Sequence, residues 1–227
     1  MKLKSFLKRF FLGAEVLEKV NSPVNGEISV VENLFGGKEL RIGGLTQSGG
    51  LVEKLWEKIF NFKFLILNQF QSSNFKCLIL GLGCGTAAKL TGERWPEAKI
   101  IGVEMDPAVV KIGKKYFGLG KIKNLEIVIG DAVKVISEKK YVTGKDFDLI
   151  LVDLYLGKNY PKAAESKEFL QALKNILSKK GLVIINRLYY NSVFEEQAES
   201  FLLKVKEIFP TVKIKKAVTN LLVFASN

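Results

Sequence analysis

The stretch Lys76-Cys-Leu-Ile-Leu-Gly-Leu-Gly-Cys-Gly-Thr86 decides the fold. Its apolar half, Lys76–Leu80, is short and continuous, which is typical of a strand buried on both faces of a parallel sheet. The glycines that follow let the backbone approach a ligand closely, and a helix after them would present free N–H groups. The turn is not the dinucleotide fingerprint, because Thr86 stands where that pattern has Gly or Ala. A tight strand-to-helix turn without a ligand would also fit these residues.

Strand-like runs and amphipathic helical segments alternate along the chain from residue 75 onward. The strand-like runs cover residues 76–80, 99–103, 125–129, 147–152 and 182–185. The helical segments lie between and after them, near residues 86–94, 107–117, 131–138, 165–178 and 193–208. This alternation predicts an α/β domain with a doubly wound, Rossmann-like parallel sheet and right-handed crossovers. A terminal strand pair is expected at 212–217 and 221–225, with the last strand antiparallel.

The residues before this domain follow a different pattern, so we expect three parts in the chain. Residues 1–14 predict an amphipathic helix that packs in the core or at a subunit interface. Residues 15–48 predict a small β-hairpin segment, because Phe35-Gly-Gly37 separates two strand-like runs. The Rossmann-like domain then spans residues 49–227 and begins with a helix at 50–62.

The composition excludes several kinds of site. The 227 residues include no histidine, so Ser-His-Asp and Cys-His machinery and histidine-ligated metal sites are ruled out. The two cysteines, Cys77 and Cys84, have neither disulfide-framework nor zinc spacing, which favours a reducing cytoplasm and no metal. No uncharged apolar stretch reaches the roughly 18 residues of a transmembrane segment.

The net charge of +12, from 35 Lys+Arg against 23 Asp+Glu, leaves two interpretations open. The lysines are scattered, which favours an ordinary solvated surface. A nucleic acid or an anionic membrane surface is the alternative partner.

Carboxylates follow three successive predicted strands after the glycine-rich turn. Glu104 lies 23 residues past Gly81, where a carboxylate can accept hydrogen bonds from both ribose hydroxyls. Asp131 could cap the next helix or accept a hydrogen bond from an exocyclic amine. Asp153 follows an apolar run and precedes Tyr155, and a carboxylate there is costly without a partner. Because the carboxyl ends of parallel strands share one edge, the set predicts a nucleoside pocket with Asp153 beside the reacting group.

Four motifs resemble, in order, those of the class I S-adenosylmethionine-dependent methyltransferase fold, and within it the spermidine synthase-like family. They are Leu80-Gly-Leu-Gly-Cys-Gly-Thr86, Gly102-Val-Glu-Met-Asp106, Gly130-Asp-Ala132 and Ile150-Leu-Val-Asp153. The resemblance covers roughly residues 15–225 and implies S-adenosylmethionine, or its decarboxylated form, as donor. It also suggests a homodimer. The donor-binding residues that it implies are Gly81, Gly83, Cys84, Gly85, Glu104, Met105, Asp131 and Ala132.

Departures from the family bear on the activity. Aminopropyltransferases of the family carry a Gly-Gly-Gly-Asp-Gly-Gly turn, and Cys84 stands in place of its Asp. A carboxylate there would repel the carboxylate of S-adenosylmethionine, whereas a thiol would not. Leu156 replaces the second acid after the fourth strand, and a Tyr-His-Glu cluster has no counterpart, although Gln47 is retained. The missing groups would hold a cationic diamine.

The leading hypothesis is therefore a spermidine synthase-like methyltransferase acting on a small-molecule acceptor. Asp153 or Tyr155 would orient or deprotonate the nucleophile, and Gln47 and Tyr160 would contact the substrate. The loop 154–163 would close over the site. One alternative is aminopropyl transfer in polyamine biosynthesis, with Asp153 as base. A third is a non-catalytic protein that docks on nucleic acid or membrane.

Overall fold

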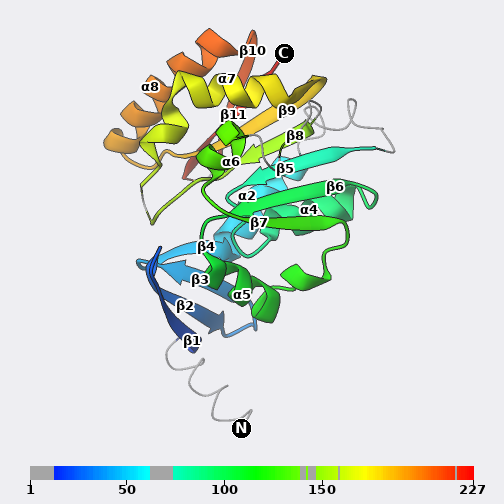
Figure 1. Ribbon diagram of the computed structural model, residues 1–227. Helices are drawn as coiled ribbons and strands as arrows, with labels where there is room; N and C mark the ends of the chain where they lie inside the picture. Colours follow the sequence, from blue (N-terminus) through cyan, green and yellow to red (C-terminus); the bar gives the residue numbers. More distant parts are fainter. Residues whose placement is uncertain (1–12, 62–73, 139–141, 143–146, 158, 218) are drawn as a thin grey trace.

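The computed structural model describes residues 13–61, 74–138, 142, 147–157, 159–217 and 219–227. It contains a seven-stranded mixed sheet and, before it in the chain, a four-stranded antiparallel sheet (Figure 1). The predicted amphipathic helix at 1–14 falls almost wholly outside the described residues. Among the helices that the structure describes, none is both long and apolar enough to cross a membrane.

The seven-stranded sheet has the predicted doubly wound α/β architecture. Its strands are β5 (Lys76–Leu80), β6 (Lys99–Glu104), β7 (Leu125–Ile129), β8 (Phe147–Val152), β9 (Leu177–Leu188), β10 (Thr211–Ala217) and β11 (Asn220–Ser226). The order across the sheet is β10-β11-β9-β8-β5-β6-β7. The pairings from β9 to β7 are parallel, and β11 is antiparallel to both β9 and β10. The antiparallel terminal strand is thus confirmed.

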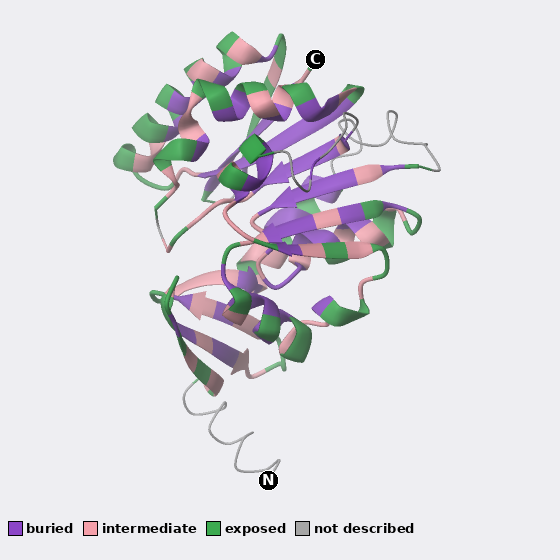
Figure 2. Cartoon of the chain, in the orientation of Figure 1, coloured by how far each residue is buried: buried purple, intermediate pink, exposed green. Residues whose placement is uncertain are grey.

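Helices cover both faces of this sheet (Figure 2). One face packs against α6 (Ala132–Glu138), α7 (Lys167–Ile176) and α8 (Ser192–Ile208). The other packs against α2 (Gly50–Phe60), α4 (Thr86–Arg94) and α5 (Pro107–Tyr116). The central strands are buried on both sides, as their continuous apolar runs predicted.

Strand β9 begins earlier than the sequence pattern predicted. The helix expected to reach residue 178 ends at Ile176, because Leu177 has extended backbone angles, φ −78° and ψ 137°. Leu177 then pairs with Phe147 of β8, and a register shift follows before the regular pairing of the two strands.

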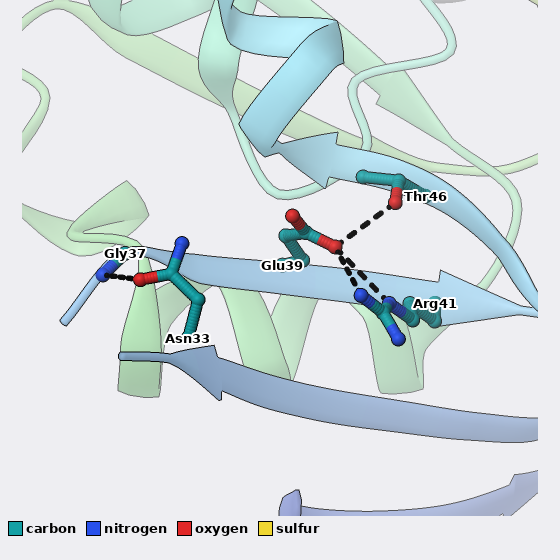
Figure 3. Close-up of polar contacts among 5 residues, drawn as sticks. All are labelled: Asn33, Gly37, Glu39, Arg41 and Thr46. Carbon is teal, nitrogen blue, oxygen red and sulfur yellow. Dashed lines mark hydrogen bonds and ion pairs between the residues drawn. The ribbon is translucent and has the colours of Figure 1, made fainter. Parts of the chain in front are cut away.

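The N-terminal sheet is larger than a hairpin. Its strands β1 (Ala14–Ser22), β2 (Gly26–Asn33), β3 (Lys38–Ile42) and β4 (Leu45–Gly49) pair in sequence order. The predicted turn between β2 and β3 is present, and Gly36 adopts φ +81° in it. The Asn33 side chain accepts a hydrogen bond from the Gly37 N–H at 2.9 Å, and Glu39 accepts bonds from Arg41 and Thr46 (Figure 3).

The two sheets meet at α5. Asp106 caps this helix through Oδ1, which accepts a hydrogen bond from the Ala108 N–H at 2.8 Å. Its Oδ2 accepts bonds from the Ser22 hydroxyl at 2.5 Å and the Asn25 amide at 2.7 Å. An apolar cluster that includes Leu40 and residues of α5 completes the joint. The N-terminal sheet is thereby held at the carboxyl edge of the parallel strands, where the candidate site lies.

Candidate active site

The glycine-rich turn after β5 packs tightly against the end of β8. Gly81 has φ +88°, and a Cβ atom built on it would lie 2.1 Å from the Asp153 carbonyl oxygen. Only glycine combines that backbone conformation with so close an approach. The Gly81 and Leu82 N–H groups both donate to the Val103 carbonyl, at 3.0 and 2.9 Å. The turn therefore joins β5, β6 and β8 at one point, and it forms the floor of a cavity.

Glu104 stands at the end of β6 and fixes this turn from the other side. Its Oε2 accepts a hydrogen bond from the Gly83 N–H at 2.8 Å, and its Oε1 accepts one from the Asp106 N–H at 3.0 Å. Burial raises the pKa of the carboxyl group, and the two hydrogen bonds oppose that shift. Each carboxylate oxygen has further lone-pair capacity, which a ribose hydroxyl can use.

Asp131 takes the capping role, one of the two that the sequence left open, and it also lies in the cavity wall. Its Oδ1 accepts a hydrogen bond from the Val133 N–H at 2.8 Å and so caps α6. The same residue lines the cavity, so its second oxygen remains for a ligand. Met105 and Ala132 lie beside it in the cavity wall.

These groups surround a first cavity of about 170 Å³, which we call the donor cavity. The parallel strands contribute residues at their carboxyl ends, and the N-terminal sheet contributes Asn25, Leu40, Ile42, Gln47 and Ser48. The described lining contains three carboxylates, Glu104, Asp131 and Asp153, and neither lysine nor arginine. Most of the predicted cofactor residues are thus brought together.

Cys84 and Gly85 are the exceptions, since neither lines the donor cavity. Cys84 is 1% exposed, and its Sγ lies 3.9 Å from the Val109 carbonyl oxygen under α5. Burial raises the pKa of the thiol to about 12, so it stays neutral at physiological pH. The Cys84 N–H donates to the Ser48 hydroxyl at 3.0 Å. Cys84 therefore contributes a neutral, buried side chain to the turn rather than a ligand contact.

The N-terminus of α4 opens on the donor cavity. Gly85 is its N-cap residue and has no side chain to accept hydrogen bonds from the first turn. Thr86 and Ala87, the first helical residues, line the cavity. The first N–H groups of a helix and its dipole favour an anion at that end.

Asp153 lies at the far end of the donor cavity with both carboxylate oxygens engaged. Its Oδ1 accepts a hydrogen bond from the Asn186 amide at 2.8 Å, and its Oδ2 accepts one from the Trp56 indole N–H at 3.3 Å. Burial raises the pKa of this carboxyl group, and the two hydrogen bonds oppose the rise. The sequence analysis singled out neither Trp56, which lies in the predicted helix at 50–62, nor Asn186, which is polar within the buried strand β9.

The two tyrosines predicted at the site are placed differently from Asp153. The Tyr155 hydroxyl accepts a hydrogen bond from the Leu188 N–H at 2.7 Å and lies 3.3 Å from the Asn186 carbonyl, to which it donates. Burial raises the pKa of Tyr155, so its hydroxyl stays protonated and does not act as a base. Tyr160 does not line the donor cavity. Its ring packs edge-on against the Tyr155 ring, with 5.5 Å between the ring centres. The Arg187 guanidinium lies 3.8 Å from the centre of the Tyr160 ring.

A second cavity, of about 480 Å³, adjoins the first. It is bounded by β4, α2, the end of β9 and the turn between β10 and β11. Gln47, Val52, Asp153 and Tyr155 line both cavities. Gln47 also donates to the Gly157 carbonyl at 3.2 Å, which ties β4 to the loop predicted to cover the site.

The fold and this edge of the sheet define a spermidine synthase-like, S-adenosylmethionine-dependent methyltransferase fold. A family model described as "Methyltransferase domain" matches residues 74–226, and the chain belongs to that family.

The individual relatives include two kinds of transferase. The chain is 29% identical over 126 residues to the polyamine aminopropyltransferase of Vibrio vulnificus. The aligned region covers 56% of this chain and 42% of that protein. It is 26% identical over 155 residues to the eEF1A lysine and N-terminal methyltransferase homolog of Drosophila melanogaster, covering 66% of this chain and 23% of that protein. The chain therefore spans less than half the length of either relative. A probable spermidine synthase from Corynebacterium glutamicum superposes with a TM-score of 0.77 at 19% identity, over 93% of this chain and 79% of that one.

Proposed function

We propose that this chain is an S-adenosylmethionine-dependent methyltransferase that acts on a small-molecule acceptor. S-adenosylmethionine would occupy the donor cavity. Glu104 would accept hydrogen bonds from the ribose hydroxyls, and Asp131 would accept one from the adenine amine through its second oxygen. Met105 and Ala132 would contact the base.

The observation that carries the choice of donor is the uncharged turn before α4. The side chain at its centre is the buried, neutral thiol of Cys84, and the first turn of α4 faces the cavity without a side-chain cap. That end of the helix favours the carboxylate that S-adenosylmethionine has and its decarboxylated form lacks.

Asp153 would supply the remaining chemistry. The sulfonium of the donor already activates its methyl group, so placing a nucleophile in line with the C–S bond gives most of the rate. Asp153 would hold the nucleophile and accept its proton, and its raised pKa brings it nearer to the working pH of a general base. Trp56 and Asn186 would fix its orientation. Tyr155 would act as a positioning residue, because its hydroxyl bonds to the backbone of β9.

Aminopropyl transfer is the second candidate, and the charge of the donor cavity favours it. The described lining carries three carboxylates and no basic side chain, which also suits a donor without a carboxylate. A polyamine aminopropyltransferase is among the relatives. The two functions differ in which donor binds more tightly.

Calorimetric titration with S-adenosylmethionine and with its decarboxylated form separates them. We expect the carboxylated donor to bind at least tenfold more tightly. Glu104→Ala should weaken binding by roughly 10- to 100-fold, since hydrogen bonds to a charged group are lost. Glu126→Ala removes an exposed carboxylate on β7 and should change nothing. Tighter binding of the decarboxylated donor would favour aminopropyl transfer, and binding of neither would contradict both functions.

A further inference from the structure

We propose that the acceptor is a primary amine with one cationic end and an uncharged, mainly apolar body, bound in the second cavity with its nitrogen at Asp153. The inference rests on the proposed methyltransferase function and names its substrate class. We call this second cavity the acceptor cavity.

The position of the acceptor cavity supports this use. Asp153 and Tyr155 line both cavities, so a group bound at Asp153 from the acceptor side faces the donor. Gln47 and Val52 also line both cavities. With about 480 Å³, the acceptor cavity is larger than its neighbour and can hold the body of a small molecule beyond the reacting nitrogen.

The charge in the acceptor cavity limits what that body can carry. Asp153 is the one carboxylate among the described lining residues, and lysine and arginine are absent from them. Leucines dominate the apolar part of the wall: Leu45, Leu51, Leu55 and Leu188. A single ammonium group finds its counter-charge at Asp153. A second ammonium group held against the leucines would lose its bound water without gaining a counter-charge, which is costly.

One polar part of the wall is a chain of neutral side chains that ends on Asp153. The Thr219 hydroxyl donates to Asn220 Oδ1 at 2.9 Å, and Asn220 Nδ2 donates to Asn186 Oδ1 at 2.9 Å. Asn186 Nδ2 then donates to Asp153 Oδ1 at 2.8 Å. All three donors are directed toward Asp153, so the chain stabilises its negative charge. These amides are already bonded to each other and carry no charge that could replace a second carboxylate.

The reaction at this junction balances without a further reagent. The ammonium group of the acceptor gives one proton to the Asp153 carboxylate and becomes a neutral amine. The nitrogen lone pair then forms a bond to the methyl carbon of S-adenosylmethionine, the C–S bond breaks, and its electron pair stays on sulfur. The products are S-adenosylhomocysteine and a protonated N-methylamine, and Asp153 later loses its proton to water.

The test compares pentylamine with 1,5-diaminopentane, which have the same carbon chain and differ in the second ammonium group. Each is titrated by calorimetry into the protein saturated with S-adenosylhomocysteine. We expect pentylamine to bind at least tenfold more tightly. Leu51, on the first turn of α2, lines the cavity and is 64% exposed, so Leu51→Glu adds a carboxylate without burying it. This variant should raise the affinity for the diamine severalfold relative to the neutral control Leu51→Gln.

Three results would overturn the inference. They are equal or tighter binding of the diamine to the native protein, no gain for the diamine in Leu51→Glu over Leu51→Gln, and binding of neither amine. Binding of S-adenosylmethionine is measured first in the same titration series. Its loss would count against the proposed function, whereas the three results above count against the inference alone. If the protein binds S-adenosylmethionine but the amine results contradict the inference, the methyltransferase proposal is unaffected.

Discussion

The donor cavity and the acceptor cavity meet at Asp153, yet they are built in different ways. The donor cavity takes its three carboxylates from residues at or just after the ends of β6, β7 and β8. The acceptor cavity takes its wall from segments far apart in the chain, such as α2 and the turn before β11. The donor side carries three carboxylates in its described lining and the acceptor side one. The donor is thus specified by local motifs, and the acceptor by how distant segments pack.

The largest effect is expected where the donor cavity joins the end of β8. Gly81→Ala would place a Cβ atom 2.1 Å from the Asp153 carbonyl oxygen at a positive φ. We expect more than a 100-fold loss of donor affinity and a loss of about 3 kcal/mol in the free energy of unfolding. Donor titration and denaturant unfolding measure the two effects.

Gly118→Ala is the matched control, because φ is +74° there and nothing lies within 4 Å of the added Cβ atom. It should lose about 1–2 kcal/mol through backbone strain alone and keep its donor affinity. Equal effects of the two substitutions would contradict the close packing assigned to the turn.

The next largest effect is expected at the residue that both cavities share. Asp153→Asn removes the proposed base while nearly keeping the size of the side chain. Methyl transfer to pentylamine should fall by roughly 10²- to 10⁴-fold in kcat, a range typical for loss of general-base catalysis. Steady-state kinetics would check this. A variant that keeps more than a third of the native kcat would exclude Asp153 from proton transfer.

A smaller effect is expected one hydrogen bond away, on the acceptor side. Burial raises the pKa of Asp153 above its ordinary 3.8, and the Asn186 hydrogen bond lowers it. Because the base acts as the carboxylate, kcat/KM for the native protein should rise with pH through that pKa and then level off. Asn186→Ala should move the inflection to higher pH. An unchanged inflection would show that Asn186 does not act on Asp153.

The smallest effect is expected at Cys84. Because its thiol lies under α5 and outside the donor cavity, Cys84→Ala should change the affinity for S-adenosylmethionine by less than about twofold. The cost in the free energy of unfolding should be about 1 kcal/mol, from the lost packing of a small buried group. A large loss of affinity without a loss of stability would place the thiol at the ligand after all.

The same contrast explains what the sequence could predict. The strands 76–80, 125–129 and 147–152 were predicted with the bounds that the structure gives, because buried strands are continuous apolar runs. The predicted end of α7, at residue 178, was wrong, because no glycine or proline marks the change from helix to strand at Leu177. The carboxylates of the donor cavity could be found because each follows a strand.

The partners of Asp153 could not be found in that way. Trp56 and Asn186 are 97 and 33 residues from Asp153 in the sequence, and only the packing of α2 and β9 brings them to it. Tyr155 was chosen for its position two residues past Asp153, but the backbone turns its hydroxyl toward β9. The predicted homodimer and the polyanionic partner suggested by the net charge stay predictions.

The most direct measurement is the identity of the group transferred. The protein is incubated with pentylamine and equal amounts of S-adenosylmethionine and its decarboxylated form, and the amine products are identified by mass spectrometry. If the donor and acceptor cavities serve a methyltransferase with Asp153 as its base, the native protein should form N-methylpentylamine. The Asp153→Asn variant should form almost none. An aminopropylated product, or no product from a protein that binds both compounds, would contradict that account.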